Sequence, residues 1–570
     1  MSELKEYIVT CKDRQDLDSL YDDMETPGGN LYIPDRAVEL VHRRTISRNT
    51  HYMLTAEEAE QVRNDPRVLG CEITFKDSGI IEVGYDWTQT ADFNKTTGTF
   101  ASDDKNWGLY RVIEGDSVAN WGSDNTSKIS NQSIVTTSSG KNVDVVIVDA
   151  HINPDHPEFA VNPDGTGGSR VNQFNWFQYS SALGYSTPTT YTYSTSGASP
   201  NSNHGTHVAG TACGNTQGWA RDANIYNMAF QDSLANVSNW SQILWDYLRY
   251  FHLNKPINPD TGRRNPTITN HSWGSSYINL YLTDSGTHVD SVDYRGTTTT
   301  MTGTQSERRA LLEARGVPCP RVTYVYRLPS ADIASSADIE DAINDGVIII
   351  SAAGNSSFNA DIPTGPDYNN TLSFTFSDII SLTVYTNRGA SPGFCPGVIC
   401  VGSIGSKVAE YKSYFSNWGE RVDIWAPGSD IISAVYDSSS ATTEGGFTPL
   451  VQDSRNSSYY LASIDGTSMS SPQVAGVIAC LAELEPNLTQ AEALQYLKET
   501  SLAEVGDQGG DPHQFPYEGF GDSNNRYLFY KNKRPLEGQT SPNVLNKNRN
   551  PDTAGVKYPR TRNRVFKPKA

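Results

Sequence analysis

The sequence predicts an α/β protein in which a mostly parallel central sheet carries helices on both faces, preceded by a small α/β domain. Between residue 106 and about residue 530, short apolar runs alternate with helical patterns, as is typical of parallel sheets. Two of these runs, 143–148 and 346–353, have the composition and length of buried strands. A chain of 570 residues is long enough for a large core and one or two smaller units.

Residues 1–75 show their own, shorter alternation of strands and helices. Thr55 and Glu58 form a capping-box pattern, in which each side chain binds the other residue's backbone N–H at a helix start. The predicted elements are a strand at 7–11, a helix at 14–24, a strand at 45–54, a helix from 55 to about 64, and a strand at 67–74. The polar residues 76–105, rich in Thr, Asp and Gly, read as a linker.

Three long polar inserts interrupt the alternation of the large domain, at 162–202, 275–335 and 356–392. The last forty residues, 531–570, carry eleven Lys or Arg against Glu537 and Asp552 and have no apolar periodicity. We expect this basic tail to be a flexible extension outside the core.

Composition and charge exclude several classes of function. The net charge of −20 argues against a general nucleic-acid binder, so that only the basic tail could contact a polyanion. The first residues lack the apolar stretch of a secretory signal, and no apolar run is long enough to span a bilayer. We therefore expect no membrane partner, and cytoplasmic, non-classically exported and particle-associated locations stay open. Seven widely spaced cysteines fit free thiols better than a disulfide framework.

Three strings carry the residues that a serine needs for amide hydrolysis: a base, an acid that orients it, and a nucleophile at a helix start. Asp149 ends the apolar strand 143–148. His204 lies in Asn-His-Gly-Thr-His-Val-Ala-Gly, at the start of a helix rich in small residues. Ser468 lies in Asp-Gly-Thr-Ser-Met-Ser-Ser-Pro, where a helix N-terminus favours negative charge. Each string alone is a weak signal of a catalytic site, but the occurrence of all three in one chain is a specific signal.

These strings resemble the three signatures of the subtilisin-like serine proteases, the subtilase family, in the chain order Asp, His, Ser that subtilisin itself shows. The resemblance covers most of 106–530, and Trp107-Gly108-Leu109 is similar to the mature start of proteinase K-like members. It implies a three-layer subtilisin-like fold and a serine endopeptidase that cleaves polypeptides through an acyl-enzyme, without an organic cofactor.

Further residues take roles from the same resemblance. Asn355, in Ala-Ala-Gly-Asn after the run 347–350, matches the asparagine that donates to the oxyanion. Ser272, Trp273 and Gly274 match the strand along which members bind substrate backbone. Residues 54–68 are similar to the inhibitory propeptide, a ferredoxin-like domain, which implies a zymogen that cuts its own linker. The implied units are a propeptide domain at 1–75, a processing linker at 76–105, a catalytic domain at 106–530 and the tail at 531–570.

The chain also departs from the family pattern. Ala150 stands where members usually carry a hydroxyl that supports the Asp carboxylate. After residue 213, the longer loop of the strong calcium site in bacterial secreted members is missing. Asp423 matches a cation-binding position of some relatives, with loop carbonyls at 396–399, but one carboxylate is few ligands for calcium. We therefore expect no required cofactor, and calcium stays an open alternative.

Two other functions stay open at this stage. One is a catalytically silent protein that keeps the fold for binding or scaffolding. The other is a structural role in which the basic tail tethers the chain to an assembly. The insert 356–392 enters where members build one wall of the S1 pocket, so no side-chain preference follows from the resemblance.

Overall fold

The computed structural model gives the arrangement of most of the chain. It describes residues 4–33, 36–37, 49–73, 87–95, 101, 104–115, 121, 127–185, 189–193, 202–230, 232–236, 240–276, 279–331, 333–376, 380–407, 410–436, 450–503, 512–513 and 516–530. The basic tail at 531–570 lies outside these residues, and so does most of the first half of the predicted linker.

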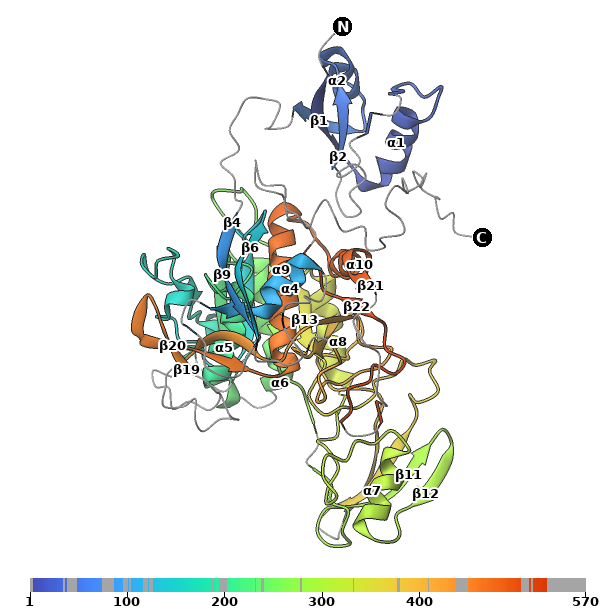
Figure 1. Cartoon of the computed structure of the whole chain (residues 1–570). Coiled ribbons are helices and arrows are strands. Elements are labelled where there is room, and N and C mark those ends of the chain that lie inside the picture. The colour runs from blue at the N-terminus through green and yellow to red at the C-terminus, as the bar shows by residue number, and fades with distance from the viewer. Residues whose placement is uncertain are drawn as a thin grey trace.

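A nine-stranded sheet forms the centre of the large domain (Figure 1). Its strand order is β21-β22-β17-β16-β13-β10-β7-β9-β8, and every neighbouring pair is parallel except β21 with β22. The strands are β7 (Asp144–Asp149), β8 (Val171–Asn172), β9 (Asn224–Ala229), β10 (Thr267–His271), β13 (Ile348–Ala352), β16 (Ile399–Ile404), β17 (Ile424–Pro427), β21 (Leu502–Ala503) and β22 (Arg526–Tyr527). The predicted mostly parallel α/β fold is confirmed.

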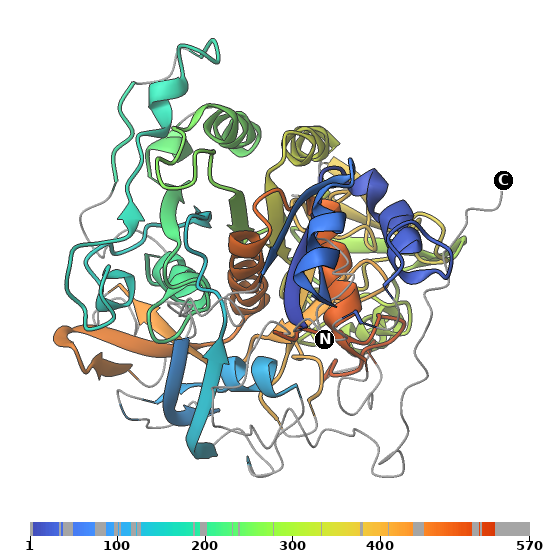
Figure 2. The same ribbon diagram turned by 90° about the horizontal axis from the view of Figure 1, so that it is seen from above.

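Helices cover both faces of this sheet, and the side-chain alternation along β7 shows why. Val145 and Ile147 belong to the core that includes α5 (Ser202–Cys213) and α9 (Thr467–Leu484). Val146 and Val148 point to the other face, in the core of α6 (Trp240–Asn254) and α8 (Ile333–Asn344). Figure 2 shows the two pairs of helices on opposite sides of the strands. Because both faces are buried, the strand reads as a continuous apolar run.

Two of the predicted inserts combine into one satellite module. β11 (His288–Tyr294) and β12 (Thr297–Thr300) come from the insert 275–335, and β14 (Thr371–Phe376) and β15 (Ile380–Tyr385) from 356–392. They form one antiparallel sheet of order β12-β11-β14-β15. With α7 (Gln305–Glu313) this sheet encloses its own apolar cluster and projects from the body (Figure 1). Separate inserts thus build a single unit.

The described residues in the second half of the predicted linker, 87–95, 101, 104 and 105, are part of the large domain, which corrects the linker expectation for them. β4 (Trp87–Asn94) pairs antiparallel with β6 (Lys128–Thr136) and parallel with β5 (Lys105–Asn106). Phe93 is fully buried and lies in the main core. Thr88 and Thr90 are exposed on the outer face of this strand, and such polar residues are why composition alone suggested a linker.

The remaining elements of the large domain surround the sheet. β18 (Ile431–Val435), β20 (Asn456–Ile464) and β19 (Leu450–Asp453) form an antiparallel sheet in that order. α4 (Trp107–Glu114) begins at Asn106, whose side chain accepts the Leu109 N–H, and α10 (Gln490–Thr500) follows α9. Short 3-10 turns lie at Pro157–Phe159, Trp176–Tyr179 and Ser233–Asn236.

The N-terminal residues form a unit with its own apolar core, which stands apart from the large domain in Figure 1. Its described strands, β1 (Lys5–Cys11), β2 (Asn49–Leu54) and β3 (Val68–Ile73), have the antiparallel order β2-β1-β3. Its helices are a 3-10 turn at Arg14–Asp16 followed by α1 (Leu17–Glu25), and α2 (Ala56–Arg63). The predicted capping box at Thr55 and Glu58 is present, with both reciprocal hydrogen bonds.

The seven cysteines are all buried thiols, as expected for a chain without a disulfide framework. Burial raises the pKa of Cys213 to about 12, so this thiol stays protonated and inert at neutral pH. Among the described helices, none has the length and apolar character needed to cross a membrane.

Candidate active site

Asp149 and His204 are in direct contact at the edge where the parallel strands end. Asp149 is the last residue of β7 and is buried, and its Oδ1 accepts the Nδ1–H of His204 at 2.8 Å. His204 lies in the first turn of α5. The small residues of this helix allow it to pack closely against its neighbours. Since Nδ1 of the neutral ring donates to the carboxylate, Nε2 carries the lone pair of a base.

The environment of Asp149 reflects the missing hydroxyl at position 150. The Ala150 backbone N–H donates to the same Oδ1 at 2.7 Å, so a backbone donor compensates in part. Oδ2 has no hydrogen-bond partner among the described residues. One oxygen of the carboxylate therefore carries both contacts.

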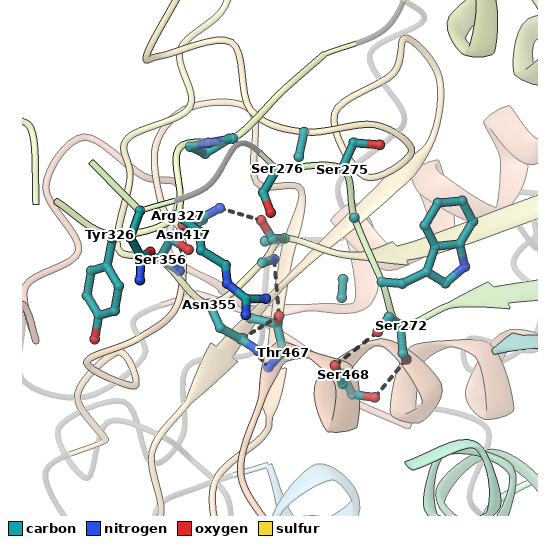
Figure 3. Close-up of a pocket in the computed structure, with 18 of the residues that line it drawn as sticks. Ser272, Ser275, Ser276, Tyr326, Arg327, Asn355, Ser356, Asn417, Thr467 and Ser468 are labelled. Atoms are coloured by element: carbon teal, nitrogen blue, oxygen red, sulfur yellow. Dashed lines mark hydrogen bonds between the residues drawn. The ribbon is translucent and has the colours of Figure 1, made fainter. Parts of the chain in front are cut away.

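Ser468 is the second residue of α9, directly after the turn residue Gly466 and Thr467. Its hydroxyl donates to the Ser272 carbonyl at 3.1 Å, rather than to His204, and the Ser272 hydroxyl donates to the Ser468 carbonyl at 2.8 Å (Figure 3). Ser272 follows β10, whose His271 pairs with Val148 of the adjacent β7, so Ser272 and Asp149 end neighbouring parallel strands. The structure thus brings all three predicted residues to one edge of the sheet, and a rotation about the Ser468 side-chain bond redirects its hydroxyl.

Two N–H donors border one space beside Ser468. Oδ1 of Asn355, which follows β13, accepts the Thr467 N–H at 2.9 Å and the Thr467 hydroxyl at 2.7 Å. A Cβ placed on Gly466 would lie 3.4 Å from Asn355 Nδ2 and 3.5 Å from the Ser468 backbone N. The amide of Asn355 and the backbone of Ser468 therefore face the same point, as an oxyanion site requires.

Thr467 and Asn417 support this arrangement, and sequence reasoning assigned neither of them a role. Thr467 fixes which end of the Asn355 amide faces the space. Oδ1 of Asn417 accepts the N–H groups of Ser356 and Phe358, while its Nδ2 donates to the Ala353 carbonyl at 2.7 Å. Asn417 thus clamps the loop that carries Asn355. Thr467 lies inside the string that carries Ser468, which was the only signal for it.

A pocket of about 380 Å³ opens beside Ser468 (Figure 3). The predicted substrate-binding residues Ser272, Trp273 and Gly274 line one side, and Asn355 lies on another. Ser272 is buried, Trp273 packs against the rings of Phe230 and Trp240, and Gly274 is exposed. The satellite module contributes a further wall through residues 324–329, so the pocket is built partly from an insert.

Two other histidines near the site have structural roles. His207 is fully buried on α5, and its Nε2–H donates to the carbonyls of Ile431 and Ala462, at 2.9 and 3.1 Å. Burial lowers its pKa to about 3, so the ring stays neutral and ties α5 to β18 and β20. His151 is also buried, beside the Tyr193 and Tyr436 rings, with Nδ1 3.5 Å from Oδ2 of Asp232.

The candidate calcium position at Asp423 is filled by a side chain of the protein. Nη1 of Arg421 donates to Oδ2 of Asp423 at 2.8 Å, and Nη2 donates to the carbonyls of Cys395 and Val398. The guanidinium thus binds the carboxylate and the loop carbonyls that a cation would need. These residues do not fit a calcium ion at this position. Elsewhere in the described residues, no group of three His, Cys, Asp or Glu could hold a metal.

Comparison with known proteins identifies relatives of the chain. Alkaline protease 1 of Emericella nidulans is 24% identical over 392 residues, which cover 68% of this chain and 63% of that protein. The alkaline proteinase of Hapsidospora chrysogena is 26% identical over 320 residues, covering 56% of this chain and 52% of the relative. The chain thus spans less than two thirds of the length of these two relatives.

Among solved structures, a cold adapted subtilisin-like serine proteinase aligns with 74% of this chain and 97% of its own, at 21% identity and a TM-score of 0.40. The model of the subtilase family matches residues 140–521, which include Asp149, His204, Asn355 and Ser468. The match extends over more than half of the chain, and the chain belongs to the subtilase family.

Proposed function

We propose that the chain is a serine endopeptidase that cleaves polypeptides through Asp149, His204 and Ser468. The observation that carries this proposal is the 2.8 Å contact between Asp149 and His204, at the sheet edge where Ser468 begins α9. Family membership and relatives named as proteases support the same reaction.

Each step follows from the chemistry of these groups. His204 takes the proton of Ser468 as the hydroxyl oxygen attacks the peptide carbonyl carbon, and Asp149 stabilises the imidazolium that forms. The resulting oxyanion accepts hydrogen bonds from Asn355 Nδ2 and the Ser468 N–H. The C–N bond then breaks as His204 protonates the leaving amine, and water hydrolyses the acyl-enzyme with His204 again acting as base.

The N-terminal unit is proposed to be an inhibitory propeptide whose removal activates the enzyme. Its separate core and its resemblance over residues 54–68 support this role. Because β4 belongs to the large domain, the cut that separates the two units is proposed to lie before Trp87.

The test is mass spectrometry of wild-type and Ser468→Ala protein after incubation with a fluorophosphonate probe. Wild type should lose an N-terminal fragment and gain one probe on Ser468, while Ser468→Ala stays full length and unlabelled. Ser458→Ala, which removes an exposed hydroxyl on β20, is the matched control and should behave as wild type. An intact, unlabelled wild type, even after limited removal of residues 1–75, would favour the silent binding protein instead.

A further inference from the structure

The pocket beside Ser468 lies where a substrate must place one particular side chain. In a bound substrate, the scissile carbonyl carbon lies at the Ser468 hydroxyl and the carbonyl oxygen faces Asn355 Nδ2. The Cα of the same substrate residue is bonded directly to that carbonyl carbon. Its side chain then enters the pocket that Ser468, Asn355 and Ser272 border. The chemistry of this pocket therefore selects the P1 residue, the one on the N-terminal side of the cleaved bond.

Among the described residues that line the pocket, Arg327 is the only charged one. Figure 3 shows its side chain extending into the pocket from the insert segment. The segment is firmly anchored, because Val325 and Leu328 are fully buried in the satellite core and the Val325 N–H donates to the Leu280 carbonyl at 2.7 Å. The Arg327 guanidinium is thus carried by a backbone segment that is fixed on both sides.

Other arginines of the satellite module are engaged within the protein, whereas the exposed Arg327 has no ion pair or hydrogen bond with a described residue. Arg295 pairs with Asp367, Arg308 with Asp284 and Arg309 with Glu313. Arg321, on the same loop as Arg327, lies over the Tyr324 ring. In a chain with a net charge of −20, one unpaired guanidinium in the pocket is positioned to bind an anion.

We infer that the pocket accepts an acidic P1 side chain, Asp or Glu, and that Arg327 is the residue that determines this specificity. This inference rests on the proposed function and adds its substrate class. The Arg327 guanidinium donates to the P1 carboxylate, a charge-assisted hydrogen bond that a neutral amide replaces poorly. The catalytic groups are unchanged by this assignment, since Arg327 touches the substrate side chain and not the reacting atoms.

The test compares succinyl-Ala-Ala-Pro-Glu-p-nitroanilide with its Gln counterpart, which has the same shape without the charge. Wild type at pH 7.5 should cleave the Glu substrate with a kcat/KM about tenfold higher than the Gln substrate. Arg327→Gln should bring this ratio close to one, and Arg327→Glu should invert it. Arg321→Gln changes an arginine of the same loop outside the pocket and should keep the wild-type ratio.

Fluorophosphonate labelling of Ser468 separates the two proposals. Labelled wild-type enzyme that cleaves Gln or Phe at P1 as well as Glu, or whose Glu:Gln ratio survives Arg327→Gln, would overturn the acidic specificity alone. Wild-type enzyme that is neither labelled nor active on any peptide would overturn the proposed function and the specificity with it. A cleaved peptide mixture read by mass spectrometry should independently show Asp and Glu enriched on the N-terminal side of the cuts.

Discussion

The carboxylate of Asp149 holds His204 through Oδ1 at 2.8 Å, while its Oδ2 has no hydrogen-bond partner among the described residues. The side chain at position 150 is a methyl group, so it has nothing to donate. A hydroxyl there should bind Oδ2 and fix the carboxylate more firmly against the imidazole. Ala150→Ser is therefore expected to raise kcat/KM about threefold, the effect of one ordinary hydrogen bond. Steady-state kinetics on a peptide nitroanilide measure this change.

Ala150→Val is the control for this substitution, because it adds volume without a donor. It should give no gain, and thermal melting shows whether either variant disturbs the fold. An Ala150→Ser enzyme that is folded but no faster would mean that Oδ2 is already satisfied, for example by an ordered water.

The space shared by Asn355 Nδ2 and the Ser468 N–H can be closed with one methyl group. In Gly466→Ala the new Cβ would stand 3.4 and 3.5 Å from the two nitrogens and would exclude the oxyanion. We expect kcat to fall at least about 100-fold, since removing one oxyanion donor costs 10²–10³ in subtilisin, a member of this family. Gly286→Ala, at another glycine of positive φ with open space around it, controls for backbone strain and should keep full activity.

The strands, helix starts and catalytic strings could be predicted because each depends on a short, continuous stretch of sequence. The run 143–148 is apolar enough to be a buried strand, and Ser468 lies in the first turn of a helix of small residues. The contacts that finish the site are not local. Asn417 clamps the Asn355 loop from about sixty residues away, and Arg327 enters the pocket on an insert. Two inserts that combine into one sheet, and a polar strand β4 that resembles a linker, leave no periodic signal that identifies their partners.

We expect that Arg421 takes the place of a bound cation at Asp423, and removing its side chain tests this. In the Ser468→Ala background, which prevents self-digestion, Arg421→Ala leaves two carbonyls without this donor. The half-buried Asp423 carboxylate keeps the Cys400 N–H at 3.0 Å but loses its cationic partner. We expect a loss of about 3 kcal/mol in stability, as for other broken buried ion pairs. Added millimolar calcium should recover part of this loss in Arg421→Ala. Differential scanning calorimetry with calcium and with EDTA checks both expectations.

Lys407→Ala, which breaks an exposed ion pair with Glu518, is the control and should change stability by less than about 1 kcal/mol. If calcium stabilised the parent protein and Arg421→Ala equally, the cation would bind elsewhere and Arg421 would not be its replacement.

The burial of the Lys412 side chain leads us to expect that the stability of the protein depends on pH. The buried Lys412 ammonium donates to the carbonyls of Ser413 and Ser416, each at 3.0 Å, in the turn that leads to Asn417. Burial lowers the pKa of Lys412 to about 7, from an ordinary value of 10.5. Above pH 7 the folded state therefore binds fewer protons than the unfolded state at this group. Its contribution makes stability rise with pH between about 7 and 10, and it is constant below pH 7, where both states are protonated.

Lys412→Arg and Lys412→Met both remove this titration, because neither side chain changes its charge in that range. Denaturation midpoints at pH 7, 8 and 9, again in the Ser468→Ala background, should rise more steeply for the parent protein than for the folded variants. Equal slopes would show that Lys412 keeps an ordinary pKa.

The position of β4 predicts where the chain is cut if it processes itself. Phe93 packs its ring 5.2 Å from that of Tyr110, and the Lys95 ammonium lies 4.9 Å from the Trp121 ring centre. Asp104 to Asn106 are buried, so a new terminal ammonium there would lie in the core without water. The mature chain should consequently begin before Trp87, and the intact mass of the larger wild-type fragment measures its first residue. A fragment that begins between 104 and 107 would contradict this. Phe93→Ala provides an independent check, because loss of a buried ring should cost about 3–5 kcal/mol of stability only if β4 stays with the large domain after processing.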